Sequence, residues 1–156
     1  MIVINKVLVP TDFSDYSAAA MRYACEVSRR FGSQMHLLHV VADAAMLIPE
    51  TTEFVGEALA DATHAAITRA TERLNGMPNC AFQSDREVIR CVRAGSPVTE
   101  IVRYAKEADV DLIVLGTHGR TGLSHLLMGS VAENIVRIAP CSVLTVKPEG
   151  HQFVMP

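Results

Sequence analysis

Short apolar runs alternate with longer helix-type segments along the whole chain, and this alternation limits the possible folds more than any other feature. The apolar runs cover residues 3–9, 35–41, 87–92, 112–115 and 141–146. The helix-type segments between them begin near residues 14, 52, 96 and 130. Strict alternation of this kind predicts a parallel sheet with helices on both faces, joined by right-handed crossovers. We therefore expect an α/β fold with a single doubly wound, five-stranded parallel sheet.

The helix boundaries are marked by residues with known capping preferences. Ser14 is expected to cap the first helix, and Gly32 is a natural terminator for it. Ser96 and Pro97 open a later helix, because Ser favours the cap and Pro favours the first helical position. Ser130 is expected to cap the last helix.

Length and charge narrow the possible classes of function. The chain has 156 residues, and at about 150 residues per domain this is one domain. We expect it to span residues 1–148, followed by a C-terminal tail at residues 149–156. The formal net charge of -3 argues against coating nucleic acid or an anionic membrane. The sequence contains no Trp, which disfavours stacking platforms for single-stranded bases.

The sequence gives no sign of a membrane or export function. No apolar run approaches the roughly 18 residues that a membrane span requires. The first residues carry neither a basic segment nor a small-residue cleavage site. We therefore expect a cytoplasmic protein with neither a membrane nor a nucleic-acid partner.

The cysteines and histidines do not have metal-ligand spacing. No two of the four cysteines lie within three residues of each other, so there is no pair typical of zinc or redox sites. Reduced thiols are expected, as in a cytosolic protein. His36 and His39 share a predicted strand, where a separation of three residues places them on opposite faces. We predict no zinc site.

Three loops should meet at the carboxyl edge of the sheet, where ligands bind in folds of this class. They cover residues 10–15, 94–97 and 116–122. In the last loop, Gly116 and Gly119 allow positive φ angles and leave no Cβ in the path of a ligand. The same glycines could merely build a turn.

The start of the last predicted helix has the character of an anion site. Gly129 and Ser130 precede residues whose backbone N–H groups have no partner within the helix, and the helix dipole adds a positive potential there. Ser130 could add a hydroxyl donor, while His118 and Arg120 could add positive charge. Phosphate is the natural ligand for such an arrangement, although a plain helix cap would use the same residues.

These motifs together resemble the ATP-binding universal stress proteins. Gly116, two residues, Gly119, nine residues, Gly129 and Ser130 match the glycine signature of that family. Residues 7–14, 37–40 and 140–146 also look like the first strand and turn, the second strand and the last strand of the family. The resemblance covers nearly the whole chain and keeps the order of the family's elements.

The resemblance implies a Rossmann-like fold, similar to the adenine nucleotide alpha hydrolases, with strand order 3-2-1-4-5. That order reverses between the first and fourth strands, which places Asp12 and Gly116 on opposite sides of one crevice. The cofactor would be ATP, or ADP or AMP, with Mg²⁺. The implied nucleotide-site residues are Pro10, Thr11, Asp12, Val40, Gly116, Thr117, His118, Gly119, Arg120, Gly129, Ser130 and Val131.

Two of these residues have more specific expected roles. Val40 should contact the apolar plane of adenine. Asp12 could accept a hydrogen bond from ribose or help to hold Mg²⁺, a cation that prefers oxygen ligands. Asp12 could also serve only to form the turn beside Ser14.

The resemblance further implies a homodimer through the last strand, Cys141 to Val146, which is an uncharged edge strand in this order.

Several functions remain open at this stage. The first is a nucleotide-dependent switch or regulator of the stress response, since no P-loop lysine motif is present. The others are a slow ATP hydrolase and an interaction protein with a vestigial nucleotide pocket. A phosphoacceptor receiver domain would need an Asp after the third strand, where this chain has Ala94 and Gly95.

Overall fold

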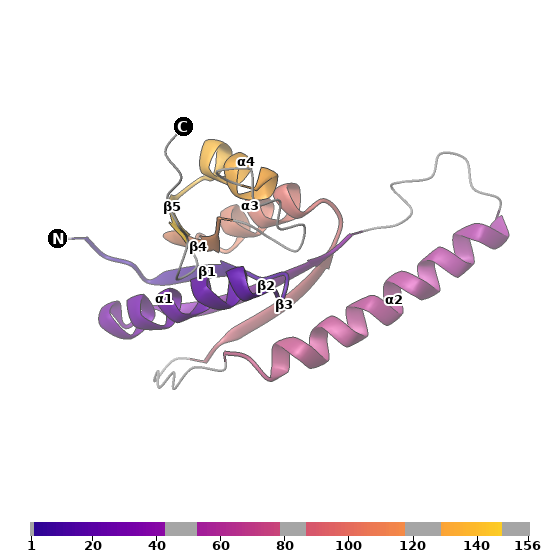
Figure 1. Cartoon of the computed structure of the whole chain (residues 1–156), viewed down its shortest axis with the longest axis horizontal. Helices are drawn as coiled ribbons and strands as arrows, with labels where there is room; N and C mark the ends of the chain where they lie inside the picture. Colours follow the sequence, from indigo (N-terminus) through magenta and orange to yellow (C-terminus); the bar gives the residue numbers. More distant parts are fainter. Residues whose placement is uncertain (1, 43–52, 79–86, 118–128, 148–156) are drawn as a thin grey trace.

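A five-stranded, all-parallel sheet organises the computed structural model of the chain (Figure 1), which describes residues 2–42, 53–78, 87–117 and 129–147. The strand order is β3-β2-β1-β4-β5, which confirms the predicted topology. The elements are β1 (Lys6–Pro10), α1 (Asp15–Phe31), β2 (Gln34–Val41), α2 (Glu53–Asn75), β3 (Ile89–Ala94), α3 (Pro97–Glu107), β4 (Leu112–Gly116), α4 (Ser130–Ile138) and β5 (Ser142–Val146). The predicted tail lies outside the described residues.

Two helices cover each face of the sheet. Figure 1 shows α1 and α2 on one side of the strands and α3 and α4 on the other. Alternate residues of β1 supply the two cores: Val7 and Val9 pack with α1, whereas Leu8 packs with α3 and α4. All three of these side chains are fully buried. A strand buried on both faces explains why the first run is almost continuously apolar.

Strand pairing shifts the first and third strands from their predicted positions. The first strand was expected from residue 3, but pairing with β2 begins at Lys6, and Val3 is 63% exposed. The third strand was expected at residues 87–92, but it pairs with β2 from Ile89 to Ala94. Both predictions followed apolar character, whereas the ends of a strand depend on where its neighbour offers backbone partners.

The helix ends agree with the expected caps except in α4. The Ser14 hydroxyl accepts the backbone N–H of Ser17, and Gly32 ends α1 with a φ of 64°. The prediction that Ser130 caps the last helix is wrong, because Gly129 is the cap and Ser130 is the first helical residue. The extended conformation of Gly129 lets its carbonyl accept the first helical hydrogen bond, from the N–H of Glu133.

One cysteine departs from the expected reduced state. Cys25 lies on the buried face of α1 and is disulfide-bonded, so the prediction of reduced thiols is wrong at this position. Cys91 and Cys141 are free. Sequence spacing misses such a bond because the fold brings together residues that are far apart in the chain.

No helix in the described part of the chain is long and apolar enough to cross a membrane.

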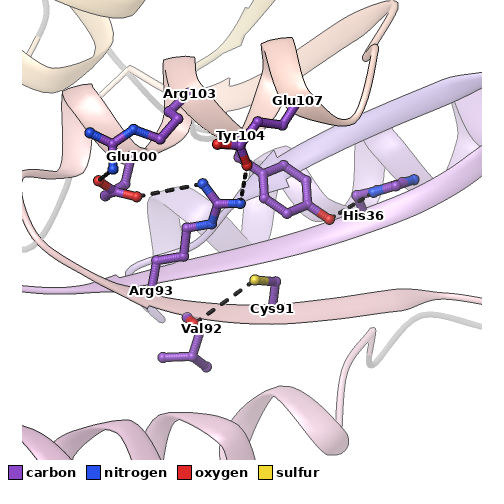
Figure 2. Close-up of polar contacts among 8 residues, drawn as sticks. All are labelled: His36, Cys91, Val92, Arg93, Glu100, Arg103, Tyr104 and Glu107. Carbon is purple, nitrogen blue, oxygen red and sulfur yellow. Dashed lines mark hydrogen bonds and ion pairs between the residues drawn. The ribbon is translucent and has the colours of Figure 1, made fainter.

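His36 is a buried histidine under α3, at 6% exposure. Its Nδ1 lies 2.9 Å from the hydroxyl of Tyr104. Figure 2 marks this contact between β2 and α3 with a dashed line. Its Nε2 is buried and has no hydrogen-bond partner among the described residues. Burial lowers the pKa of His36, and the positive charge of Lys6 lowers this pKa further. The folded protein therefore favours the neutral imidazole.

We expect the protein to lose stability as the pH falls below the unfolded-state histidine pKa of about 6.5. Below that pH the unfolded chain binds a proton at His36 more readily than the folded chain does, so the free energy of unfolding decreases until the folded-state pKa is passed. Urea unfolding measured between pH 8 and 5 should give a free energy of unfolding that changes less with pH for His36→Asn than for the wild type, because asparagine does not titrate. The exposed His64→Asn should keep the wild-type profile, and equal profiles for all three proteins would contradict the prediction.

Candidate functional site

A cavity of about 330 Å³ opens at the carboxyl edge of the sheet, where the strand order reverses between β1 and β4. This volume is within the range of small-molecule sites. Its lining residues are Pro10, Thr11, Asp12, Ser17, Leu38, Val40, Pro97, Ile101, Leu115, Gly116, Thr117, Gly129, Ser130, Val131 and Ala132. Nine of the twelve sequence-predicted site residues are therefore brought together. The other three, His118, Gly119 and Arg120, lie outside the described residues.

The wall formed by β2, β4 and α3 is apolar. Leu38 and Val40 come from β2, Leu115 from β4 and Ile101 from α3. Leu38, Leu115 and Ile101 are each at most 5% exposed, so they are fixed by the core behind them. This wall suits a flat, apolar group. Sequence reasoning missed Ile101 as a site residue. The signal available was the spacing of apolar residues in its helix, which shows that Ile101 is on the buried face but not that it borders a cavity.

The loop between β1 and α1 forms the acidic side of the cavity. The Asp12 carboxylate accepts hydrogen bonds at Oδ1 from the backbone N–H of Ser14 at 3.0 Å and from its hydroxyl at 2.6 Å. The buried Thr11 hydroxyl lies 3.0 Å from that of Ser17, which also lines the cavity. Asp12 thus forms the turn at the start of α1 and lines the cavity, so the two roles considered for it are compatible.

The N-terminus of α4 forms another part of the cavity lining. Gly129 caps the helix, and its N–H donates to the carbonyl of Thr117 at 2.7 Å. Within the described residues no side chain caps this end of the helix. The first residues of α4, 130–132, line the cavity. A helix start without a side-chain cap at the edge of a cavity presents a positive potential and backbone donors to an anion.

Ion pairs fasten α3, which carries the lining residues Pro97 and Ile101, to β3. The Arg93 guanidinium lies 3.5 Å from the Glu100 carboxylate and also binds Glu107 (Figure 2). Glu100, whose side chain is 10% exposed, also pairs with Arg103 at 2.6 Å. The hydrogen bond to Glu107 is the main cause of a raised Arg93 pKa. Arg93 is paired in the sheet with the lining residue Val40, so this network fixes the wall beside it.

With this geometry described, comparison with known proteins gives the family. The sequence profile of the universal stress protein family matches residues 4–147. The chain belongs to the universal stress protein family. Universal stress protein MJ0531 of Methanocaldococcus jannaschii is 32% identical over 143 residues, which cover 92% of this chain and 82% of that protein.

Solved structures show the same fold. The universal stress protein UspA from Lactobacillus plantarum has a TM-score of 0.82 at 27% identity, covering 94% of this chain and 99% of that chain. A universal stress protein solved in complex with cAMP has a TM-score of 0.62 at 24% identity, covering 95% of this chain and 100% of that chain.

Gly116 of this universal stress protein is required for a reason that differs from the predicted one. Its φ is outside the positive range, so conformational freedom is not what selects glycine here. A Cβ at this position would lie 2.7 Å from the backbone carbonyl oxygen of Tyr16 in α1. The glycine therefore permits the end of β4 to pack against the start of α1, which brings the two sides of the cavity together.

We expect Gly116→Ala to destabilise the protein by about 1–3 kcal/mol, because the added methyl group meets backbone atoms that cannot rotate away. Thermal or urea unfolding measures the loss. Gly76→Ala is the matched control, since the nearest atom to its added Cβ would be at an ordinary 3.6 Å. Equal stability of the two variants would show that α1 is not packed on β4 as described.

Proposed function

We propose that this universal stress protein binds ATP, or the related ADP or AMP, in the cavity and acts as a nucleotide-dependent switch or regulator in the stress response. One observation carries the proposal: an apolar wall, a helix N-terminus without a side-chain cap and a carboxylate line the same cavity. These three features correspond to the base, the phosphates and the metal of a nucleotide complex.

The apolar wall suits adenine. Val40 stands at the end of β2 among buried aliphatic side chains, so a planar base placed against it removes apolar surface from water on both partners. The solved universal stress protein that contains cAMP supports an adenine nucleotide as the ligand class.

The phosphates are best placed at the N-terminus of α4. Among the described lining residues no side chain is cationic, so backbone donors and the helix dipole supply the attraction for an anion there. The Ser130 hydroxyl, at the first helical position, is an additional donor.

The Asp12 carboxylate fits a magnesium ion accompanying the nucleotide. Mg²⁺ is commonly held by one or two carboxylates together with phosphate oxygens and water. Asp12 is the charged lining residue in the described part of the chain, and it lines the same cavity as the first residues of α4. It would hold the ion while Ser130 and the α4 amides hold the phosphates.

Regulation is favoured over slow hydrolysis and over a vestigial pocket. Efficient phosphoryl transfer needs groups that orient the attacking water and neutralise charge on the transferred phosphate. The described lining residues include a single carboxylate, and the chain has no P-loop lysine motif to neutralise that charge. A vestigial pocket would be filled by bulky side chains, whereas this one is open. ATP and Mg²⁺ are abundant in the cytoplasm, which is the proposed location.

We also propose a homodimer formed through β5. β5 is an edge strand that pairs with β4 on one side. Next to it in the chain, α4 exposes Val136 at 47% and Ile138 at 55%. An edge strand beside exposed apolar side chains is suited to pairing with a second copy of itself.

Calorimetric titration should show Mg-ATP binding that Ser130→Glu weakens by about tenfold, which is the effect of about 1.4 kcal/mol of repulsion between the added carboxylate and the phosphates. Adenosine, which carries no phosphate, should bind both proteins similarly. Thr68→Glu adds the same charge on the exposed surface of α2 and should bind ATP like the wild type. Absence of binding by ATP, ADP and AMP to the wild type would refute the proposed function.

Light scattering after gel filtration should give twice the 16.9 kDa chain mass for the wild type. Val136→Glu should shift the population toward the monomer, because a charge is then buried in the apolar contact. Phe31→Glu, on the opposite face at the end of α1, should remain dimeric. A monomeric wild type at micromolar concentration would remove the dimer proposal.

A further inference from the structure

Phe13 adopts a strained backbone conformation in the loop that carries Asp12. Its φ is 62°, in the left-handed region that a bulky residue rarely enters. It stands directly between Asp12, which lines the cavity, and Ser14, which caps α1. A residue in this conformation persists only where surrounding contacts determine it. The contacts around Phe13 therefore bear on where the Asp12 carboxylate is held.

Two residues from different elements hold the Phe13 ring. The ring of His39, in β2, has its centroid 4.5 Å from that of Phe13, with the planes inclined by 34°. The Arg73 guanidinium, from the last turn of α2, lies over the Phe13 ring at 4.0 Å from its centroid. The aromatic pair and the cation over the ring each add attraction beyond the burial of apolar surface.

His39 also holds the residue on the other side of Asp12. Its Nδ1 lies 2.7 Å from the backbone carbonyl oxygen of Thr11. A carbonyl oxygen can only accept, so Nδ1 carries the hydrogen and donates it. The Thr11 hydroxyl in turn accepts the backbone N–H of Phe13 at 3.0 Å. His39 thus contacts both neighbours of Asp12, one through a hydrogen bond and the other through its ring.

His39 is outside the cavity itself. It is 9% exposed and is absent from the lining, which β2 supplies through Leu38 and Val40. Its hydrogen bond to Thr11 and its ring contact with Phe13 connect His39 to the site through the loop. We propose that His39 is a positioning residue for the nucleotide site, which holds Thr11 and Phe13 so that the Asp12 carboxylate is fixed at the cavity. This inference rests on the proposed function.

A double-mutant cycle tests whether His39 acts through Asp12. His39→Phe keeps an aromatic ring beside Phe13 but removes the donor to Thr11. We expect it to weaken Mg-ATP binding by about tenfold, as loss of a group that orients a metal ligand does. In the Asp12→Asn background the same change should weaken binding less than about twofold, because the two residues act together. Equal losses in both backgrounds would overturn the proposal.

His36→Phe is the matched control. His36 is the other buried histidine of β2 and lies on the opposite face, where it contacts Tyr104 rather than the loop. Its replacement should lower stability without coupling to Asp12. Coupling of the same size for His36→Phe would show that any damage to β2 has this effect, and it would overturn the proposal.

Amide hydrogen exchange without nucleotide separates this inference from the proposed function. The N–H groups of Phe13 and Ser14 donate to Thr11 Oγ1 and Asp12 Oδ1. Both should exchange faster in His39→Phe than in the wild type, and at the wild-type rate in His36→Phe. His39→Asn keeps an N–H near the position of Nδ1 and should restore part of the protection. If the wild type binds no adenine nucleotide, the proposed function fails. Exchange rates of the Phe13 and Ser14 amides that stay unchanged in His39→Phe would refute the role of His39 in holding the loop, whatever the outcome for nucleotide binding.

Arg73→Ala provides a second variant in case His39→Phe does not fold. Arg73 is exposed, so its replacement leaves the core intact. It should weaken Mg-ATP binding by about threefold, in keeping with the modest strength of an exposed cation–ring contact, and this loss should vanish in the Asp12→Asn background. Arg69→Ala, one turn earlier on α2 and also exposed, should have no effect. Equal effects of the two arginine variants would contradict the proposed role of the ring stack.

Discussion

The close approach of the end of β4 to the start of α1 is the contact on which the site depends. Gly116 has no side chain, so the carbonyl of Tyr16 lies where a Cβ would otherwise stand. This contact brings the loop that carries Asp12 into the same cavity as the first turn of α4. Strand order alone would place these segments at one edge of the sheet, but only this packing brings them within reach of one small molecule.

The cavity has a consistent distribution of charge. The helix start contributes positive potential from backbone groups, and Asp12 contributes negative charge on the opposite side. A ligand that carries phosphates and a divalent cation satisfies both sides at once. Asp12 is held by its turn with Ser14, and the apolar α3 wall is held by the pairing of Arg93 with Glu100.

Much of the architecture could be predicted because its signals are local. The caps at Ser14 and Gly32 depend on a few neighbouring residues, and both were recognised from the sequence. The first strand was placed too early, because Val3 is apolar but has no partner strand beside it. The cap of α4 was assigned to Ser130 instead of Gly129, since the glycine satisfies its role through backbone conformation and not through a side chain.

The sequence by itself determined the order of the elements, the loops that meet at the carboxyl edge and most of the residues that line the cavity. Periodicity, capping and the parallel sheet are sufficient for the element order and the loops, whereas the lining residues followed from the resemblance to the universal stress protein family. Only the tertiary structure decided why Gly116 must be glycine, that Cys25 is bonded and that His39 holds the Asp12 loop. These facts depend on contacts of a few ångströms between residues far apart in the chain, and the pattern of apolar and polar residues does not encode such distances.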